Sequence, residues 1–235
     1  MANIDYDYWI GKYEITNKQF FNFIISAIKS NKIFLKNGVL KTVFPGNEII
    51  ASDTFPIKIW NEDIYLKNGF PTLNEAYSNH PVVSVTWFGV YAFCDYYGFR
   101  IPSGAEWEKA AKGNKKWWFP WGNNIDSTYA NYFNSNDPYE PGTTPIGFYN
   151  GKINNGFKTS KAESFFGCYD MAGNAWEWTN DYWSKEVPYY KGKGGGYVYH
   201  FPAALQVYYT SSYGPSKPPK LEMNDLADGF RIVIK

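Results

Sequence analysis

The stretch from Gly167 to Trp183 constrains the fold of this chain most, because neighbouring side chains in it need opposite surroundings. Three apolar side chains that must be buried alternate with three polar ones that need hydrogen bonds or a cation: Trp176, Trp178 and Trp183 with Asn174, Glu177 and Asp181. Gly173 lets the backbone turn just before Asn174, so that oxygens there can face one centre. The pattern indicates a core with polar anchors, which is either a packed turn or strand or a site for an oxygen-seeking ion.

Composition indicates one folded domain with more aromatic side chains than its core requires. Hydrophobic residues make up 44% of the 235 residues, enough for a sizeable core, and charged residues make up 19%, which argues against disorder. Aromatic residues make up 21%, so we expect some rings to face a partner. We treat residues 1–235 as a single domain.

The charges nearly cancel, with 23 Lys and Arg against 22 Asp and Glu. This balance gives no field for a nucleic-acid backbone or an anionic membrane. The first seven residues hold acidic side chains where a signal peptide carries basic ones, and no apolar run reaches the roughly 18 residues of a membrane span. We therefore expect a cytoplasmic or virion-associated protein with no nucleic-acid and no membrane partner. We also expect a monomer.

Two capping boxes predict where two helices begin. Thr16 and Gln19 follow an expected strand over residues 9–15 and start a helix that runs to about residue 30. Ser103 and Glu106 start another, with Gly113 as its stop. Residues 80–87 are expected to form a short strand leading into a helix that ends at residue 98 and is apolar nearly all round, which predicts burial.

Other parts of the chain give weaker signals. Residues 31–79 are punctuated by Gly and Pro and are expected to be an irregular insert with short strands at most. Residues 229–233 predict a closing strand. His80 precedes a proline and is expected to be extended and structural. The two cysteines, Cys94 and Cys168, permit one bridge at most, and the apolar surroundings of Cys94 favour a reduced thiol.

Several motifs resemble, in order, those of the formylglycine-generating enzyme family, also called sulfatase-modifying factors. They are Gly11 to Phe20, His80 to Trp87, Arg100 to Glu108, Phe119 to Asn123, Tyr129 to Tyr132, Gly173 to Trp178 and Gly229 to Arg231. The resemblance covers residues 10–233 except the insert. It implies an α+β fold: a single C-type-lectin-like domain of the formylglycine-generating-enzyme type, rich in loops.

The resemblance also implies structural calcium. One site would involve Asn174 and Glu177, and a weaker candidate would involve Asn131 and Asp137. Calcium takes six to eight oxygen ligands, many of them backbone carbonyls, so loops can supply it without a regular motif.

The family's oxidases hold copper with two cysteines placed after a glycine-rich stretch, and this chain departs from that pattern. Tyr199 and Ala204 stand at those positions, and neither side chain binds copper(I), which prefers thiolates. Gln206 and Thr210 replace two arginines that the family often carries nearby. We therefore expect no copper and no enzyme activity, with a family oxidoreductase that has a non-copper or divergent active site as the alternative.

Residues 197–213 have the composition of a binding surface, with five tyrosines among serines, a histidine and a phenylalanine. Members of the family diversified by retroelements carry their variable residues here. We predict a solvent-facing concave surface that binds a protein or another macromolecule. The alternative is that these rings complete an aromatic core. The candidate contacts are Tyr197, Tyr199, His200, Phe201, Gln206, Tyr208, Tyr209, Ser211 and Tyr213.

Overall fold

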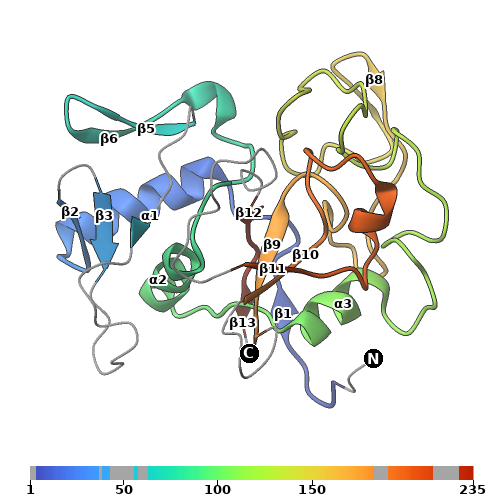
Figure 1. Cartoon of the computed structure of the whole chain (residues 1–235), viewed down its shortest axis with the longest axis horizontal. Helices are drawn as coiled ribbons and strands as arrows, with labels where there is room; N and C mark the ends of the chain where they lie inside the picture. The colour runs from blue at the N-terminus through green and yellow to red at the C-terminus, as the bar shows by residue number, and fades with distance from the viewer. Residues whose placement is uncertain are drawn as a thin grey trace.

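The computed structural model of the chain describes residues 4–36, 39–42, 56–57, 63–182, 190–213 and 228–234. Helices and small sheets joined by long loops form an α+β structure, as the sequence predicts (Figure 1). The elements, with η for 3-10 helices, are β1 (Trp9–Ile10), α1 (Asn17–Lys29), β2 (Ile33–Lys36), β3 (Val39–Thr42), β4 (Pro56–Ile57), β5 (Ile64–Lys67), β6 (Phe70–Leu73), η1 (Glu75–Tyr77), α2 (Trp87–Tyr97), α3 (Gly104–Lys112), β7 (Ile153–Asn154), β8 (Phe157–Lys158), β9 (Trp176–Tyr182), β10 (Tyr190–Lys193), η2 (Pro202–Leu205), β11 (Ser211–Tyr213), β12 (Asp228–Gly229) and β13 (Val233–Ile234).

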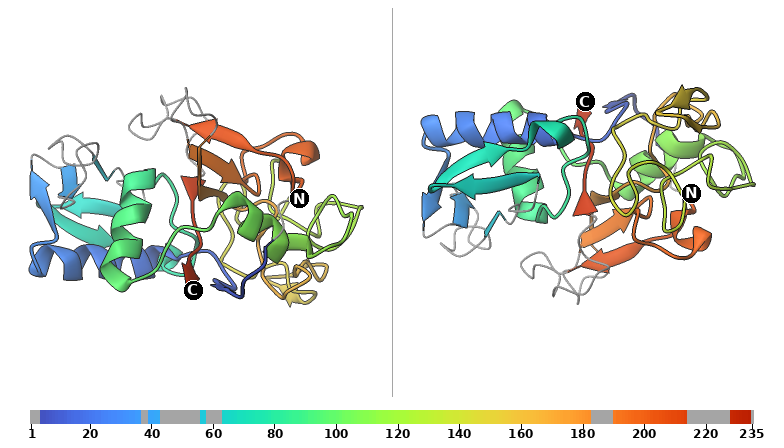
Figure 2. Two further views of the ribbon diagram at one scale, coloured as in Figure 1. Left: turned by 90° about the horizontal axis from the view of Figure 1, so that it is seen from below. Right: turned by 90° about the horizontal axis from the view of Figure 1, so that it is seen from above.

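The predicted organising stretch lies at the centre of the molecule. Its strand β9 is an inner strand of a sheet with the order β11-β10-β9-β12, antiparallel to β10 and parallel to β12. Helices α1 and α2 and the hairpins of the insert lie on one side of this sheet, and α3 and the long loops lie on the other (Figures 1 and 2). Strands β1 and β13 pair, so that segments from opposite ends of the described chain lie side by side.

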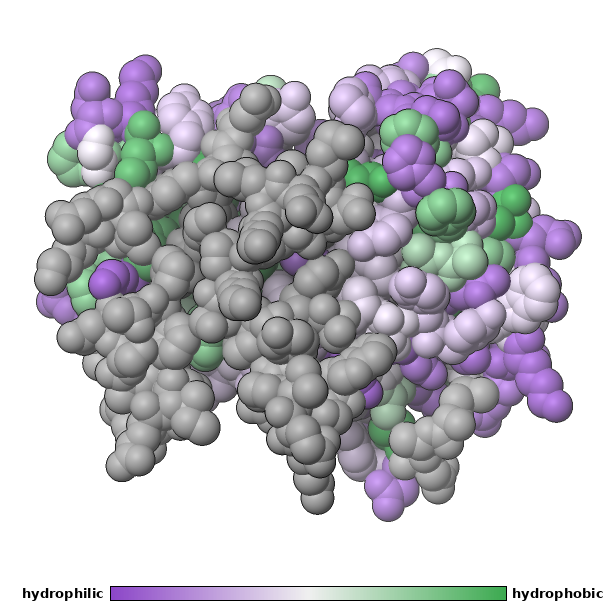
Figure 3. Space-filling view, in the orientation of Figure 1, coloured by the Kyte–Doolittle hydropathy of each residue, from purple (hydrophilic) through white to green (hydrophobic). Residues whose placement is uncertain are grey.

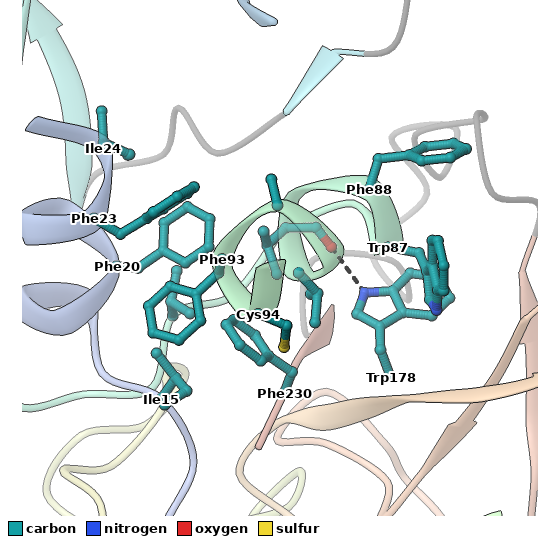
Figure 4. Close-up of a cluster of buried hydrophobic side chains, with 14 of the residues drawn as sticks. Ile15, Phe20, Phe23, Ile24, Trp87, Phe88, Phe93, Cys94, Trp178 and Phe230 are labelled. Carbon is teal, nitrogen blue, oxygen red and sulfur yellow. Dashed lines mark hydrogen bonds between the residues drawn. The ribbon is translucent and has the colours of Figure 1, made fainter. Parts of the chain in front are cut away.

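The largest hydrophobic cluster fills the space between α1, α2 and the central sheet (Figure 4). Phe20 and Phe23 of α1 pack against Phe93 of α2, and Phe230 closes the group from the end of the chain. The indole N–H of Trp178 donates to the Val85 carbonyl oxygen at 2.8 Å, so this buried polar atom is satisfied.

The helix predictions from local signals are confirmed. Both capping boxes form, with reciprocal bonds between side chain and backbone at Thr16 and Gln19 and at Ser103 and Glu106. Helix α2 ends at Gly98 in the left-handed conformation, and most of its residues are buried.

The strand predictions are wrong in extent. The expected strand over residues 9–15 is reduced to β1, and residues 80–86 contribute a single bridge between Thr16 and Pro81. The closing strand is split into β12 and β13, with Phe230 and Arg231 between them and both fully buried. The described part of the insert contains short strands, as the sequence allowed, and they are paired: β2 with β3 and β5 with β6.

Candidate functional site

A buried ion pair joins strand β9 of the central sheet to the segment between β12 and β13. Arg231 donates from Nε and Nη2 to the two carboxylate oxygens of Glu177, each at 2.6 Å, and the indole N–H of Trp107 donates to Oε2 at 2.7 Å. Both charged side chains are fully buried. Arg231 also donates to the carbonyl oxygens of Gly11 and Tyr169 at 2.9 Å. Glu177, one of the polar anchors predicted among the tryptophans, is therefore satisfied by the protein itself.

Asn174 is the hub of a second buried network. Its Nδ2 donates to Glu14 Oε2 at 2.8 Å, and its Oδ1 accepts from the Thr144 backbone N–H at 2.9 Å. Its own N–H donates to the Asn131 carbonyl oxygen at 2.9 Å. Gly173 is required for this approach, because a Cβ there would lie 2.3 Å from the Asn131 oxygen and its φ is +82°. These bonds hold the loops that contain Asn131 and Thr144 against the segment that leads into strand β9.

The buried region around Arg231 contains more carboxyl groups than guanidinium groups. Glu14 and Asp170 are buried near Glu177 and Arg231. Burial raises the pKa of Asp170 to about 6, against the lowering effect of the Gly147 N–H. Burial also raises the pKa of Glu14 well above its usual value, and the charges of Asp170 and Glu177 add to the rise.

The residues at Asn174 and Glu177 do not fit a calcium ion. Both oxygens of Glu177 are held by Arg231, whose positive charge would repel a second cation, and Asn174 Oδ1 has a backbone partner. Asp137 accepts bonds from the Ser135 and Tyr149 hydroxyls and the Tyr139 N–H. Calcium at Asn131 and Asp137 stays a prediction, and no group of three or more His, Cys, Asp or Glu side chains is arranged for a metal within the described ranges.

His80 and the two cysteines lie in packed surroundings away from the network around Asn174 and Glu177. His80 is buried, shares a 3.0 Å hydrogen bond between Nδ1 and the Thr143 hydroxyl, and has its pKa lowered to about 4 by burial. Cys94 and Cys168 are free thiols in different hydrophobic clusters. Burial raises the pKa of the Cys94 thiol to about 12, which keeps it protonated and unreactive.

The Tyr-rich segment presents four aromatic side chains to solvent. Phe201 is 71% exposed, Tyr208 is 53% exposed and Tyr209 is 42% exposed, and His200 is exposed as well. Figure 3 shows apolar residues at the surface on this side of the molecule, amid polar ones. Residues 197–201 form turns and not a strand, so the alternation of their side chains has no inward strand face behind it.

The other predicted contacts are less accessible. Tyr197 is partly buried, its N–H donates to the Asn174 carbonyl oxygen, and burial raises the pKa of its hydroxyl. Tyr199 is also partly buried and packs edge-on against Trp176, with ring centres 5.2 Å apart. Gln206 and Ser211 are intermediate in exposure. The side chain of Tyr213 lies outside the described part, although its backbone pairs with Tyr190 in the sheet.

Buried anchors hold the exposed rings in place. Lys193 is buried, donates to Glu108 Oε1 at 2.6 Å, and reaches the carbonyl oxygens of Val207 and Tyr208 at 3.4 Å. Burial lowers the pKa of this lysine, and Glu108 opposes that effect. Trp176 lies beneath Tyr199 and Tyr209. The exposed segment therefore rests on a fixed base.

Two aromatic residues from distant loops join this surface, and the sequence reasoning missed them. The Phe133 and His200 ring centres lie 3.7 Å apart, and the Phe133 N–H donates to the Tyr199 carbonyl oxygen. The exposed Trp118 accepts the Val207 N–H at its carbonyl oxygen, at 2.8 Å. Trp118 stands among other aromatic residues and Phe133 follows Tyr132, so the sequence gives no signal that sets either ring apart.

Comparison with known proteins decides the family. The sequence profile of the sulfatase-modifying factor enzyme 1-like domain matches residues 2–235. The chain belongs to this family. The structure of PvdO from Pseudomonas aeruginosa has a similar fold, with a TM-score of 0.60, 20% identity, and coverage of 96% of this chain and 79% of that one. The expected formylglycine-generating-enzyme-type fold is confirmed.

Curated relatives with differing descriptions contain similar segments. The serine/threonine-protein kinase Pkn1 of Chlamydia trachomatis is 37% identical over 129 residues, 54% of this chain and 18% of the kinase. The formylglycine-generating enzyme of Bos taurus is 28% identical over 224 residues, 82% of this chain and 57% of the enzyme. The inactive C-alpha-formylglycine-generating enzyme 2 of Bos taurus is 36% identical over 100 residues, 42% of this chain and 32% of that protein. The matches span less than two thirds of each relative.

No helix in the described part of the chain has both the length and the apolar character needed to cross a membrane.

Proposed function

We propose that this chain is a non-catalytic binding module whose Tyr-rich segment recognises a protein or another macromolecule. The observation that carries the proposal is the exposure of His200, Phe201, Tyr208 and Tyr209 on a segment whose backbone is anchored from beneath. Exposed rings on a fixed base give contact area without the entropy cost of ordering a loop.

The chemistry of the segment suits recognition of an uncharged surface patch. Residues 194–213 contain no Asp, Glu, Lys or Arg. Tyrosine offers a large apolar face, few torsions to immobilise and a hydroxyl for a polar partner. Retroelement-diversified members of the family, which this chain resembles, place their variable residues in the same region. A near-copy of the coding sequence for residues 195–231 beside a reverse transcriptase gene would support that finer assignment.

The positions of the family's copper ligands support a non-catalytic role. Tyr199 packs on Trp176 and Ala204 is buried in the same cluster. Both thiols of the chain are enclosed in other clusters. An inactive relative of the family shows that this fold is also found without the activity.

The binding surface is tested by capture from cell extract, using the chain and a variant with alanine at residues 200, 201, 208 and 209. We expect a ligand that the native chain retains and the variant loses, while the two unfold at similar urea concentrations. Equal retention by both proteins would place binding elsewhere.

The non-catalytic assignment is tested with copper(I), oxygen and a cysteine-containing peptide. We expect no stoichiometric copper binding and no peptide turnover. Turnover with one copper bound per chain would establish the family's oxidase chemistry and overturn the assignment.

A further inference from the structure

Two phenylalanines stand side by side at the apex of a turn remote from the Tyr-rich segment in sequence. The Gly167 N–H donates to the Ser164 carbonyl oxygen at 2.9 Å, which closes the turn around Phe165 and Phe166. These side chains are 50% and 57% exposed, with ring centres 4.9 Å apart. Turn apices normally carry Gly, Pro, Asn, Asp or Ser, so two exposed phenyl rings there need an explanation.

The turn is fixed to the C-terminal end of α3. The Ser164 hydroxyl donates to the Ala110 carbonyl oxygen at 2.8 Å, and the Phe165 N–H donates to that of Ala111 at 3.3 Å. Gly113 leaves room for the Phe165 ring, because a Cβ there would lie 2.8 Å from it. The turn is therefore anchored to α3, with the Phe165 ring lying against Gly113 and half exposed.

Basic residues lie near the apex, in the segment that follows α3. Lys115 Nζ lies 5.6 Å from the Phe165 ring centre and 5.9 Å from that of Trp117. Residues 109–118 contain four lysines and no acidic residue. The carboxylate of Glu163 beside the turn is paired with Lys161. The chain's net charge of +1 thus conceals a local positive excess at this end of α3.

We propose that this apex is a docking site for an anionic lipid surface, with Phe165 and Phe166 entering the interface and Lys115 and Lys116 meeting the headgroups. Charge complementarity selects an anionic partner. Two half-exposed rings at a turn favour a bilayer, because they can enter a deformable interface without a matching pocket. This inference departs from the expectation of no membrane partner, which rested on the near-zero net charge, the acidic first residues and the lack of a long apolar run.

Vesicle sedimentation tests the proposal, with vesicles of 30% phosphatidylserine in phosphatidylcholine compared with phosphatidylcholine alone. We expect binding to the anionic vesicles only, weakened by 0.5 M salt. The Phe165→Ser and Phe166→Ser double variant should bind at least about tenfold more weakly. Lys115→Gln and Lys116→Gln should each cost about fivefold. Phe70→Ser, at another exposed phenylalanine, and the Lys29→Gln and Lys32→Gln pair are the matched controls and should bind as the native chain does.

Three results would overturn the proposal. One is the absence of binding to anionic vesicles. Another is full binding by the double phenylalanine variant, which would reduce the effect to charge. The third is tight binding of poly-glutamate that depends on the two phenylalanines while vesicles are ignored, which would indicate an acidic protein partner.

Discussion

At the scale of single residues, Arg231 shows how the chain uses one buried charge to join distant segments. It contacts Glu177 in strand β9, Gly11 near the N-terminal end and Tyr169 near the start of the central stretch. The sequence predicted that Glu177 needs a partner. It could not identify Arg231, because nothing local indicates which of many charges, 54 residues away, turns inward.

Replacing Glu177 with Gln should be strongly destabilising, because the guanidinium of Arg231 stays buried without its counter-charge. We expect a loss of about 3–5 kcal/mol in the free energy of unfolding, measured by urea titration. Glu75→Gln is the control, because Glu75 and Lys18 form an exposed pair at 3.8 Å that should contribute little. Equal, small effects of both changes would show that the buried pair is not needed.

The raised pKa of Asp170 predicts that the free energy of unfolding falls as the pH rises from about 4 to about 6. Below this window the carboxyl is protonated in both states. Within it the unfolded chain releases the proton while the folded chain keeps it until about pH 6, so the free energy of unfolding declines, by on the order of 3 kcal/mol in total. Glu14 acts in the same direction. Asp170→Asn should flatten the decline, and an unchanged pH profile of urea unfolding in this variant would contradict the account.

At the scale of elements, local signals predicted helices well and strands poorly. The capping boxes at Thr16 and Ser103 are complete within four residues, so their outcome does not depend on the rest of the fold. Strand β9 has seven residues and strand β12 has two, and they pair across about 50 residues of sequence. Such pairing depends on the rest of the fold and leaves no local signal. One signal was overlooked. Asn68-Gly69 and Asn155-Gly156 both have positive φ and form two-residue hairpin loops.

Gly69 and Gly173 have nearly the same φ. Comparing their alanine variants therefore separates the cost of a close backbone contact from the cost of the left-handed conformation. Gly69 has φ +80° and open space at its Cβ position, whereas Gly173 has φ +82° and the Asn131 oxygen 2.3 Å away. Gly69→Ala should cost about 1–2 kcal/mol for the left-handed conformation alone. Gly173→Ala should cost about 1–3 kcal/mol more in the same unfolding assay, because loop and strand must separate. Equal losses would mean that the contact adds nothing.

At the scale of the whole molecule, the scaffold and the proposed binding surface have separate tasks. Buried tryptophans, Asn174 and Arg231 fix strand β9 and the loops, and the Tyr-rich segment lies over them with some rings inward and others outward. Composition predicted an excess of aromatic side chains. It could not predict that Tyr199 packs on Trp176 while Tyr208 and Tyr209 are exposed, since these turns have no regular period.

An alanine scan of the segment, read for affinity to the captured ligand and for unfolding free energy together, tests the central claim most directly. Tyr208→Ala and Tyr209→Ala should weaken binding by roughly 2 kcal/mol or more at the centre of the interface. Tyr208→Ala should change stability by less than about 0.5 kcal/mol, whereas Tyr209→Ala also loses a contact with Trp176 and should cost somewhat more. Tyr199→Ala should lower the free energy of unfolding more than the affinity, because Tyr199 packs against Trp176. If Tyr208→Ala and Tyr209→Ala unfold the protein while the affinity of the remaining folded fraction is unchanged, the segment is core and not a binding surface.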